Sequence, residues 1–483
     1  MDGEYQASNL PTYQPSVIFL FVFFSGFASL ATEIIGPRLF ASLFGYTTQI
    51  WAAIISVTLL GISLGYYLGG RVPRERAPRL LAYALLLNAA WLLAISWLIW
   101  LTPEALVQYG FISVALIALL AFLAPAVLFS LASPVSINLL SQGRSPEWIS
   151  RLVGSILATG TIGSVLGALV AAFYLIPWVG LSASLRLFAI GCCLFALYFL
   201  KKKARLAAIL ALALALALPQ PDFHWITGLT LLAQREGYYD TIRVYTDGVS
   251  SVQMHLGPTY QTIVNLETGE PEFPYARRMV ELVSQPEGKE VLIIGGAGHS
   301  VARGLEKRGA RVTEVEIDPF VAQLSDEYFG PIQGEVVVDD GRAYVDRADA
   351  GRFDYVLLDA FNSAQYIPPQ LVTREFFESV RRVLKPDGRL IINLIAVPSG
   401  TRAGLFRALS ATLWEIFVDV RASQSEGETI RNIMLVASQG DLSDLPYGLA
   451  PKDGTLLTDE LNPVEIFLER ANAGELHFRR VLQ

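Results

Sequence analysis

Glycines and acids recur at the ends of apolar runs in the second half of the sequence. The run Val291–Ile294 leads into the turn Gly295-Gly296-Ala297-Gly298. Glu316 stands 21 residues after Gly295 at the end of a second run, and Asp340 and Asp359 close a third and a fourth. An acid at that distance from a glycine turn suits hydrogen bonds from ribose hydroxyls, and a carboxylate after the third run can meet an adenine amino group. The pattern predicts a nucleoside-binding site.

A parallel sheet would bring these groups together, and the pattern from residue 290 onward predicts one. Amphipathic stretches such as 373–388, expected to be helices ending at Gly or Pro, alternate with strand-like runs. The expected strands are 290–296, 311–318, 335–340, 353–360 and 389–395. This alternation predicts a doubly wound, Rossmann-like α/β domain with its ligand at the carboxyl ends of the strands. A small antiparallel β-unit is expected ahead of it, over 236–268.

The same residues also have a structural interpretation. A glycine turn can serve packing alone, and a strand-end acid such as Asp359 can simply cap the turn that follows it. Because four such features fall in register at one sheet edge, the binding interpretation is favoured.

The first half of the chain predicts a membrane domain. The chain is 53% hydrophobic and 17% charged, and almost all of the excess hydrophobicity lies before residue 219. A spanning helix needs about 20 mostly apolar residues. Six stretches reach that length: 17–35, 50–70, 80–101, 109–133, 152–176 and 184–200. Glycines spaced every four residues, typical of close helix packing, occur at 61, 65 and 69 and again at 163 and 167.

Basic loops indicate the orientation of these spans. The Lys/Arg-containing loops 71–79, 142–151 and 201–205 fall on one side of six spans, which predicts that they and the N-terminus are cytosolic. A seventh stretch, 204–218, is short, because fifteen helical residues reach only about 22 Å against a hydrocarbon core of about 30 Å. As a span it would place the second half of the chain outside the cytosol. As an interfacial segment it would leave that half inside.

Glu33 is an acid at membrane depth, where carboxylates are costly and often functional. One interpretation is structural, either a pair with Arg38 or a position at the membrane interface. The other is a membrane site for a cationic or polar substrate.

Charge and cysteine usage exclude other classes of function. The formal net charge is −7 and the second half is acidic, which argues against a nucleic-acid partner. The two cysteines are adjacent at 192 and 193, and the four histidines are scattered, so no metal site is expected.

Residues 236–437 resemble spermidine synthase and other polyamine aminopropyltransferases, which are relatives of class I methyltransferases. The full layout resembles the membrane-fused spermidine synthase-like proteins of bacteria. The motifs that carry the resemblance are VLIIGGAGHS, VEIDP, DDGRAYV, FDYVLLDAFN and LVTREFFESVRRVLKPDGRL. The resemblance implies a displacement on a sulfonium, in which an amine attacks decarboxylated S-adenosylmethionine beside the sulfur and methylthioadenosine leaves.

The resemblance also implies roles for particular residues. Asp359 would take up or orient the proton of the amine, and Tyr275 would help to place the amine. The segment 361–372 would close over the site. The positions implied to bind the donor, or to lie in that closing segment, are Gly295, Gly296, Gly298, Gln261, Glu316, Asp340, Gly341, Asn362 and Tyr366.

The sequence departs from the family at three positions where relatives carry acids. The acid of the family's glycine loop, which binds the donor's aminopropyl ammonium, is replaced by Gly298. Asn362 and Arg277 stand where two further acids are common. Loss of these carboxylates weakens the case for a polycationic acceptor, and it would let the pocket accept ordinary S-adenosylmethionine.

We therefore expect a membrane-integral spermidine synthase-like transferase of the bacterial inner membrane, using an adenosyl-sulfonium donor and no metal. The alternatives are an S-adenosylmethionine-dependent methyltransferase acting on an amine or lipid-like acceptor, and a non-catalytic polyamine transporter or sensor. The expected parts are a transmembrane domain (1–218), a linker with a small β-unit (219–270) and the α/β domain (271–483). The α/β domain is expected in the cytosol, where the donor is made, and a homodimer is a further expectation.

Overall fold

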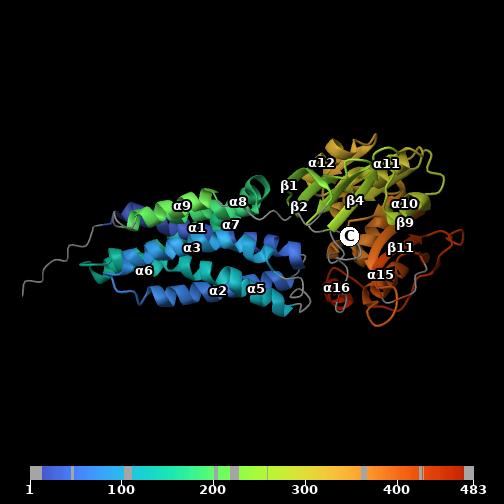
Figure 1. The fold of residues 1–483 in the computed structure, drawn as a ribbon. Helices are drawn as coiled ribbons and strands as arrows, with labels where there is room; N and C mark the ends of the chain where they lie inside the picture. The colour runs from blue at the N-terminus through green and yellow to red at the C-terminus, as the bar shows by residue number, and fades with distance from the viewer. Residues whose placement is uncertain are drawn as a thin grey trace, which may run out of the picture. The chain divides into compact units, whose positions relative to one another are not determined.

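The computed structural model describes residues 13–44, 48–102, 111–200, 205–217, 228–257, 259–360, 367–423, 427 and 429–472. The chain forms two compact units, Met1–His224 and Trp225–Gln483 (Figure 1). The finer division into three parts, with boundaries at 218 and 270, stays a prediction.

The first unit is a bundle of apolar helices. Its helices are α1 (Pro15–Phe44), α2 (Thr48–Gly69), α3 (Ala77–Trp100), α5 (Phe111–Ser130), α6 (Ala132–Leu140), α7 (Pro146–Val170), the π-helix η1 (Ala171–Val179), α8 (Leu181–Phe199) and α9 (Arg205–Ala217). Within the described residues, six helical segments are long and apolar enough to cross a membrane. They coincide with the six predicted stretches, α5 with α6 and α7 with η1 each forming one segment. Helix α9 has 13 residues, about 20 Å, which is shorter than a membrane core.

Glycines bring the helix backbones of this unit together, as their spacing predicts. On α7, a Cβ atom at Gly167 would lie 2.8 Å from the carbonyl carbon of Phe27 on α1, and Gly163 meets the backbone of Phe23 in the same way. The glycines of α2 lie against α5 and α6. Close approach of this kind is available only where side chains are absent.

The second unit begins with a small antiparallel sheet in the order β1-β2-β3-β4. Its strands are β1 (Thr230–Glu236), β2 (Thr241–Thr246), β3 (Ser251–Leu256) and β4 (Thr259–Asn265). The predicted β-unit is present, but its first strand was missed, because β1 is half-exposed and ends in polar residues. Ile242 and Met254 of this sheet pack against Phe320 and Leu324 of helix α12 (Pro319–Phe329).

The main sheet has the order β12-β10-β11-β9-β8-β5-β6-β7. Its strands are β5 (Glu290–Ile294), β6 (Arg311–Glu316), β7 (Glu335–Val338), β8 (Phe353–Leu358), β9 (Leu384–Ala396), β10 (Asp419–Ala422), β11 (Arg431–Ser438) and β12 (Gly448–Leu449). The strands from β7 to β9 are parallel, which confirms the Rossmann-like, methyltransferase-type fold. Strands β11, β10 and β12 add an antiparallel edge that the strand–helix pattern did not predict.

Helices cover both faces of the main sheet (Figure 1). Leu292 and Ile294 of β5 face a core that includes α13 (Gly341–Arg347), α14 (Arg374–Val383), α15 (Gly404–Trp414) and α16 (Val464–Asn472). Val291 and Ile293 point to the other face, which α10 (Pro274–Leu282) and α11 (Ser300–Glu306) cover. Burial on both faces explains why this strand reads as a continuous apolar run.

One predicted helix boundary is wrong. The helix expected over 373–388 ends at Val383, and Leu384, the first residue of β9, already pairs with Phe353 of β8. Pro386 cannot donate the helical hydrogen bond, and it pushes the residue before it towards extended backbone. The chain therefore enters the strand five residues earlier than the glycine at 388 suggested.

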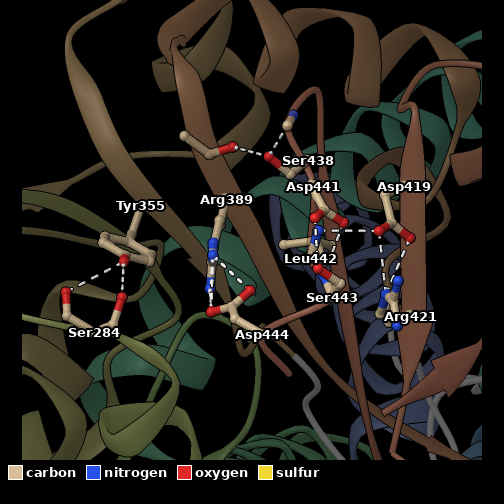
Figure 2. A network of polar contacts seen from close by, with 12 residues as sticks. Ser284, Tyr355, Arg389, Asp419, Arg421, Ser438, Asp441, Leu442, Ser443 and Asp444 are labelled. Carbon is tan, nitrogen blue, oxygen red and sulfur yellow. Dashed lines mark hydrogen bonds and ion pairs between the residues drawn. The ribbon is translucent and has the colours of Figure 1, made fainter. Parts of the chain in front are cut away.

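Ion pairs fasten the antiparallel edge to the rest of the sheet (Figure 2). On β9, Arg389 donates two-pronged hydrogen bonds to Asp444 at 3.0–3.1 Å. On β10, the Asp419 carboxylate accepts from Arg421 at 3.1 Å and from the backbone N–H of Leu442 at 3.0 Å. Two of these contacts hold the turn after β11, one to β9 through Arg389 and one to β10 through Asp419.

Helix α7 offers a matched test of the glycine packing. Gly167→Ala places a methyl group against the Phe27 backbone, whereas a Cβ at Gly154 meets nothing within 4 Å. We expect Gly167→Ala to destabilise the protein by about 1–3 kcal/mol through overpacking. Gly154→Ala should be neutral or stabilising by up to about 1 kcal/mol, because Ala is the better helix former. Thermal unfolding of the full chain in detergent measures both, and equal shifts would contradict the packing argument.

Candidate functional site

The glycine turn after β5 requires backbone that other residues rarely adopt. Gly295 has φ +88° and Gly298 has φ +71°. A Cβ atom at Gly295 would lie 2.6 Å from the Asp359 carbonyl oxygen, and one at Gly298 would clash with the Thr262 methyl group. The turn thus lies directly against the end of β8 and against β4. The absence of an acid at 298 is structurally determined, because a side chain there has neither space nor favourable backbone.

Glu316 lies at the end of β6, beside this turn. Its carboxylate accepts hydrogen bonds from the backbone N–H of Gly296 at 3.3 Å and of Asp318 at 3.0 Å. Burial raises the Glu316 pKa to about 7, and the nearby Glu314 and Asp318 carboxylates also raise it, although the two N–H donors oppose them. The side chain is therefore a fixed acceptor at the strand edge, where a hydroxyl donor would find it.

Asp340 follows β7 and begins helix α13. Its carboxylate accepts from the backbone N–H of Ala343 at 2.9 Å, as a helix N-cap. Gly341 is buried, and a Cβ atom there would clash with Ile294 of β5. Asp340 caps α13, and Gly341 allows the close packing against β5. The second oxygen of the Asp340 carboxylate can still accept a hydrogen bond from a ligand.

Asp359 ends β8 and is held by an amide that the sequence did not reveal. Asn393 of β9 donates from Nδ2 to Asp359 Oδ1 at 2.8 Å, and Asn432 of β11 donates to Asn393 Oδ1 at 2.8 Å. Burial raises the Asp359 pKa to about 7, against the lowering effect of the bonds from Asn393 and Tyr275. Asn393 lies inside the apolar run RLIINLI, and a polar residue in a strand buried on both faces was the available signal.

Tyr275 and Gln261 meet Asp359 from outside the main sheet. The Tyr275 hydroxyl on α10 lies 3.1 Å from the Gln261 carbonyl oxygen on β4 and is also hydrogen-bonded with Asp359. Its single proton can serve either acceptor. Burial and the Asp359 charge raise the Tyr275 pKa well above its usual value. The fold thus brings together three predicted residues that lie 14 to 98 positions apart in the sequence.

The residue that follows the glycine turn, His299, has a buried imidazole that contacts two carboxylates. His299 Nδ1 lies 2.5 Å from Glu314 Oε1 on β6, and Nε2 lies 3.2 Å from Asp326 Oδ1 on α12. Both His299 and Glu314 are within 1% of complete burial, whereas Asp326 is half-exposed. The hydrogen bonds and charges of the two carboxylates outweigh desolvation and raise the His299 pKa.

This cluster was not predicted, although the sequence carried a signal for it. Glu314 precedes Glu316 by two positions, so both side chains project from the same face of β6. Because two buried carboxylates on the same face of a strand are costly unless they are paired, a cationic partner is expected beside them. A Cβ atom at Gly296 would clash with the Glu314 side chain, so the turn lies directly over the pair.

Other predicted positions lie apart from this convergence. Asn362 and Tyr366 fall outside the described residues. Arg277 points away to donate to the Glu272 carbonyl oxygen at 2.9 Å. It lines a surface pocket of about 590 Å³ with Glu270, Glu281 and neighbouring residues. Within the part of the chain that the structure describes, no group of three His, Cys, Asp or Glu residues is placed to hold a metal ion.

The arrangement can bind a polyhydroxylated, adenosine-like ligand and move a proton. The glycine turn, Glu316 and Asp340 lie on consecutive parallel strand ends, where α/β sheets bind their ligands. Asp359, with its pKa near 7, can act as a base at neutral pH. The hydroxyl of Tyr275 and the carbonyl of Gln261 provide further polar atoms next to that carboxylate.

Part of the chain is similar to known proteins. Residues 272–397 match the family model described as Spermine/spermidine synthase domain. A polyamine aminopropyltransferase of Vibrio vulnificus is 32% identical over 206 residues, which cover 41% of this chain and 66% of the relative. Putrescine N-methyltransferase 1 of Nicotiana tabacum is 32% identical over 155 residues, covering 28% and 40%.

Among solved structures, a probable spermidine synthase from Corynebacterium glutamicum is 23% identical and covers 44% of this chain and 81% of its own, with a TM-score of 0.40. The chain spans no more than two thirds of the Vibrio and Nicotiana relatives.

The buried His299–Glu314 pair should contribute strongly to stability. His299→Ala leaves the Glu314 carboxylate buried without its partner, and breaking such a pair costs about 3–5 kcal/mol. Asp326→Asn, which weakens only the half-exposed contact to the same ring, should cost no more than about 1 kcal/mol. Urea unfolding of the full chain in detergent measures both. Similar losses in the two variants would show that the buried pair is not the stabilising contact.

Proposed function

We propose, on the premise that this chain is a spermidine synthase-like protein with a spermine/spermidine synthase domain at residues 272–397, that it is a polyamine aminopropyltransferase. It transfers the aminopropyl group of decarboxylated S-adenosylmethionine to an amine. The observation that carries the proposal is the convergence of Asp359, Tyr275 and Gln261 beside the strand ends that hold the glycine turn and Glu316.

The donor's nucleoside would be bound along the carboxyl edge of the sheet. Glu316 would accept hydrogen bonds from the ribose hydroxyls, and Asp340 would accept from the adenine amino group. The turn Gly295–Gly298 lets the backbone approach the ligand closely. Gln261 would lie beside the nucleoside, and the segment 361–372 would cover it. The nucleoside would thus be bound by the backbone of the glycine turn and by the carboxylates of Glu316 and Asp340.

The reaction is a displacement at carbon. The neutral amine nitrogen attacks the methylene carbon attached to the sulfonium, the new C–N bond forms as the C–S bond breaks, and methylthioadenosine leaves with the electron pair on sulfur. The attack leaves the product nitrogen as a secondary ammonium, which gives one proton to the Asp359 carboxylate. Tyr275 would orient the attacking amine next to that carboxylate.

Membrane insertion is part of the proposal. Six helical segments of the first unit are long and apolar enough to span a bilayer. With α9 too short for a seventh span, the basic loops, the N-terminus and the second unit would share the cytosolic side of a bacterial inner membrane. The amine acceptor and the donor would then both reach the site from the cytosol.

Asp359→Asn tests the catalytic assignment. We expect kcat to fall by about 10²–10⁴-fold, because the amide cannot accept the proton, while donor affinity stays close to wild type. For the wild type, kcat/KM should rise as the pH increases through about 7, where Asp359 loses its proton. That rise should disappear in the variant. Steady-state kinetics across pH with putrescine and decarboxylated S-adenosylmethionine measure both.

Asp354→Asn is the matched control, since Asp354 lies on the same strand at its other end, where it pairs with Lys289 and Lys385. It should keep kcat within about twofold. If Asp359→Asn behaves like this control, the assignment of Asp359 as the base is wrong.

A second candidate function is methyl transfer from S-adenosylmethionine to an amine or membrane-associated acceptor. Two observations favour it. The glycine turn presents no carboxylate, and Thr262 occupies the space that a side chain at 298 would need. One relative of the chain is a putrescine N-methyltransferase. A turn without that negative charge would not repel the carboxylate of the methionine group.

Donor preference separates the two reactions. Titration calorimetry of the full chain with each sulfonium should show tighter binding of the decarboxylated donor if aminopropyl transfer is correct. At least tenfold preference for the carboxylated donor, followed by methyl transfer to putrescine, would establish the second function instead. Glu316→Gln is the control, and it should weaken both donors alike by about tenfold, since it changes only the shared ribose contact.

A further inference from the structure

Glu33 is a buried carboxylate in the middle of α1 without a protein partner. Its side chain is 9% exposed and makes no hydrogen bond or ion pair with any residue that the structure describes. The pair with Arg38 that the sequence allowed is not formed. Five residues along a helix correspond to a rotation of about 140°, which turns the two side chains to different faces. A carboxylate in such a place is a functional site by default.

Helix α1, although continuous, also lacks one backbone hydrogen bond at this point. Pro37 lies inside α1, four residues after Glu33. Proline has no N–H, so the Glu33 carbonyl loses its usual helical donor. Glu33 thus presents both a carboxylate and a carbonyl oxygen that lack their ordinary partners. In membrane transporters, backbone carbonyl oxygens that lack helical donors coordinate cations.

Asn88 on α3 is another buried polar side chain without a partner among the described residues. It is 0% exposed, and among the described residues neither its Nδ2 nor its Oδ1 has a hydrogen-bond partner. Burial of an amide without hydrogen-bond partners is energetically costly. A buried amide with both ends unsatisfied calls for a ligand or water to complete it.

Helix α5 relates the positions of α1 and α3. The indole Nε1 of Trp91 on α3 donates to the Ala121 carbonyl at 3.1 Å, which Pro125 leaves without its helical donor. On α1, a Cβ atom at Gly36 would lie 2.9 Å from the ring of Phe122, the next residue of α5. Trp91 and Gly36 therefore lie at the same height in the bundle.

Glu33 precedes Gly36 by three positions on α1, and Asn88 precedes Trp91 by three positions on α3. Helices α1 and α3 run in the same direction. On α1, Phe24 meets Phe129 and Phe40 meets Phe122, so α1 is antiparallel to α5. On α3, Trp91 meets Ala121, while Arg74, just before α3, bonds the Leu139 carbonyl at the end of α6. Glu33 and Asn88 thus lie at the same level, about one turn from the Trp91 contact, inside an apolar bundle.

We infer that the membrane unit contains a binding site for a protonated primary amine, formed at this level by the Glu33 carboxylate, the Glu33 carbonyl oxygen and the Asn88 amide oxygen. An ammonium group has three donors and one positive charge, and it matches two acceptors and a carboxylate. This site goes beyond the proposed transferase activity, because it binds the amine away from the strand edge of the second unit. It rests on the membrane insertion proposed above.

Equilibrium dialysis of radiolabelled putrescine with the full chain in phosphatidylcholine nanodiscs tests the site, after subtraction of empty nanodiscs. Glu33→Gln should remove one bound equivalent per chain, because the amide has no charge to offer. Asn88→Leu, which matches the side chain in size but removes its oxygen, should weaken that equivalent by about tenfold. Glu33→Asp, which retains the charge, should keep the equivalent with reduced affinity.

Asp359→Asn is the control that separates this site from the transferase. It should leave the Glu33-dependent equivalent unchanged, and Glu33→Gln should leave donor binding to the second unit unchanged. If the second unit binds no amine, the wild type binds one equivalent and Glu33→Gln binds none. The inference would be overturned if Glu33→Gln bound as much putrescine per chain as the wild type and Asn88→Leu bound it with unchanged affinity. It would also be overturned if Asp359→Asn lost the equivalent of putrescine that depends on Glu33.

Discussion

The second unit depends on the close backbone contact between the turn after β5 and the end of β8. In the parallel register Ile294 pairs with Leu358, so the next residues, Gly295 and Asp359, lie side by side. A Cβ atom at Gly295 would lie 2.6 Å from the Asp359 carbonyl oxygen, so only glycine permits the contact. That one contact places a carboxylate with a pKa near 7 next to the turn that is proposed to bind the donor. The positions of Tyr275, Asn393 and Glu316 matter because they are arranged around it.

The second constraint is the burial of carboxylates in the second unit, each of which has hydrogen-bond donors close by. Glu314, Glu316 and Asp359 are all held at the carboxyl edge of the sheet, where desolvation raises the pKa of each. Each carboxylate has its own donors: an imidazole for Glu314, two backbone N–H groups for Glu316 and an amide for Asp359. These donors fix the carboxylates in place before a ligand arrives, which reduces the reorganisation that binding and proton transfer require.

The first unit differs, because the core between its described helices is mostly apolar. Its helices approach through glycines and satisfy most hydroxyls within their own helix, as Thr32 does with the Ala28 carbonyl. Against that background Asn88 is the buried amide whose two ends both lack partners among the described residues, and Glu33 is a buried carboxylate. The Ser25 and Ser136 hydroxyls also lack partners there. The family model matches residues 272–397, which lie inside the second unit.

The sequence by itself determined the elements and the identity of the strand-end residues, because hydrophobic period and glycine turns are local properties. It therefore predicted six spans, the parallel strands and the acids at 316, 340 and 359. It placed the end of α14 too late, although Pro386 ends the helix earlier, and it missed β1, which is half-exposed. It also missed the antiparallel edge, because that edge depends on which strand lies alongside. Only the tertiary structure decided that Asn393 holds Asp359, that His299 pairs with Glu314, and that Arg38 leaves Glu33 unpaired. Such pairs join residues from different strands and helices, or from different faces of one helix, so side-chain direction and packing decide them and sequence spacing does not.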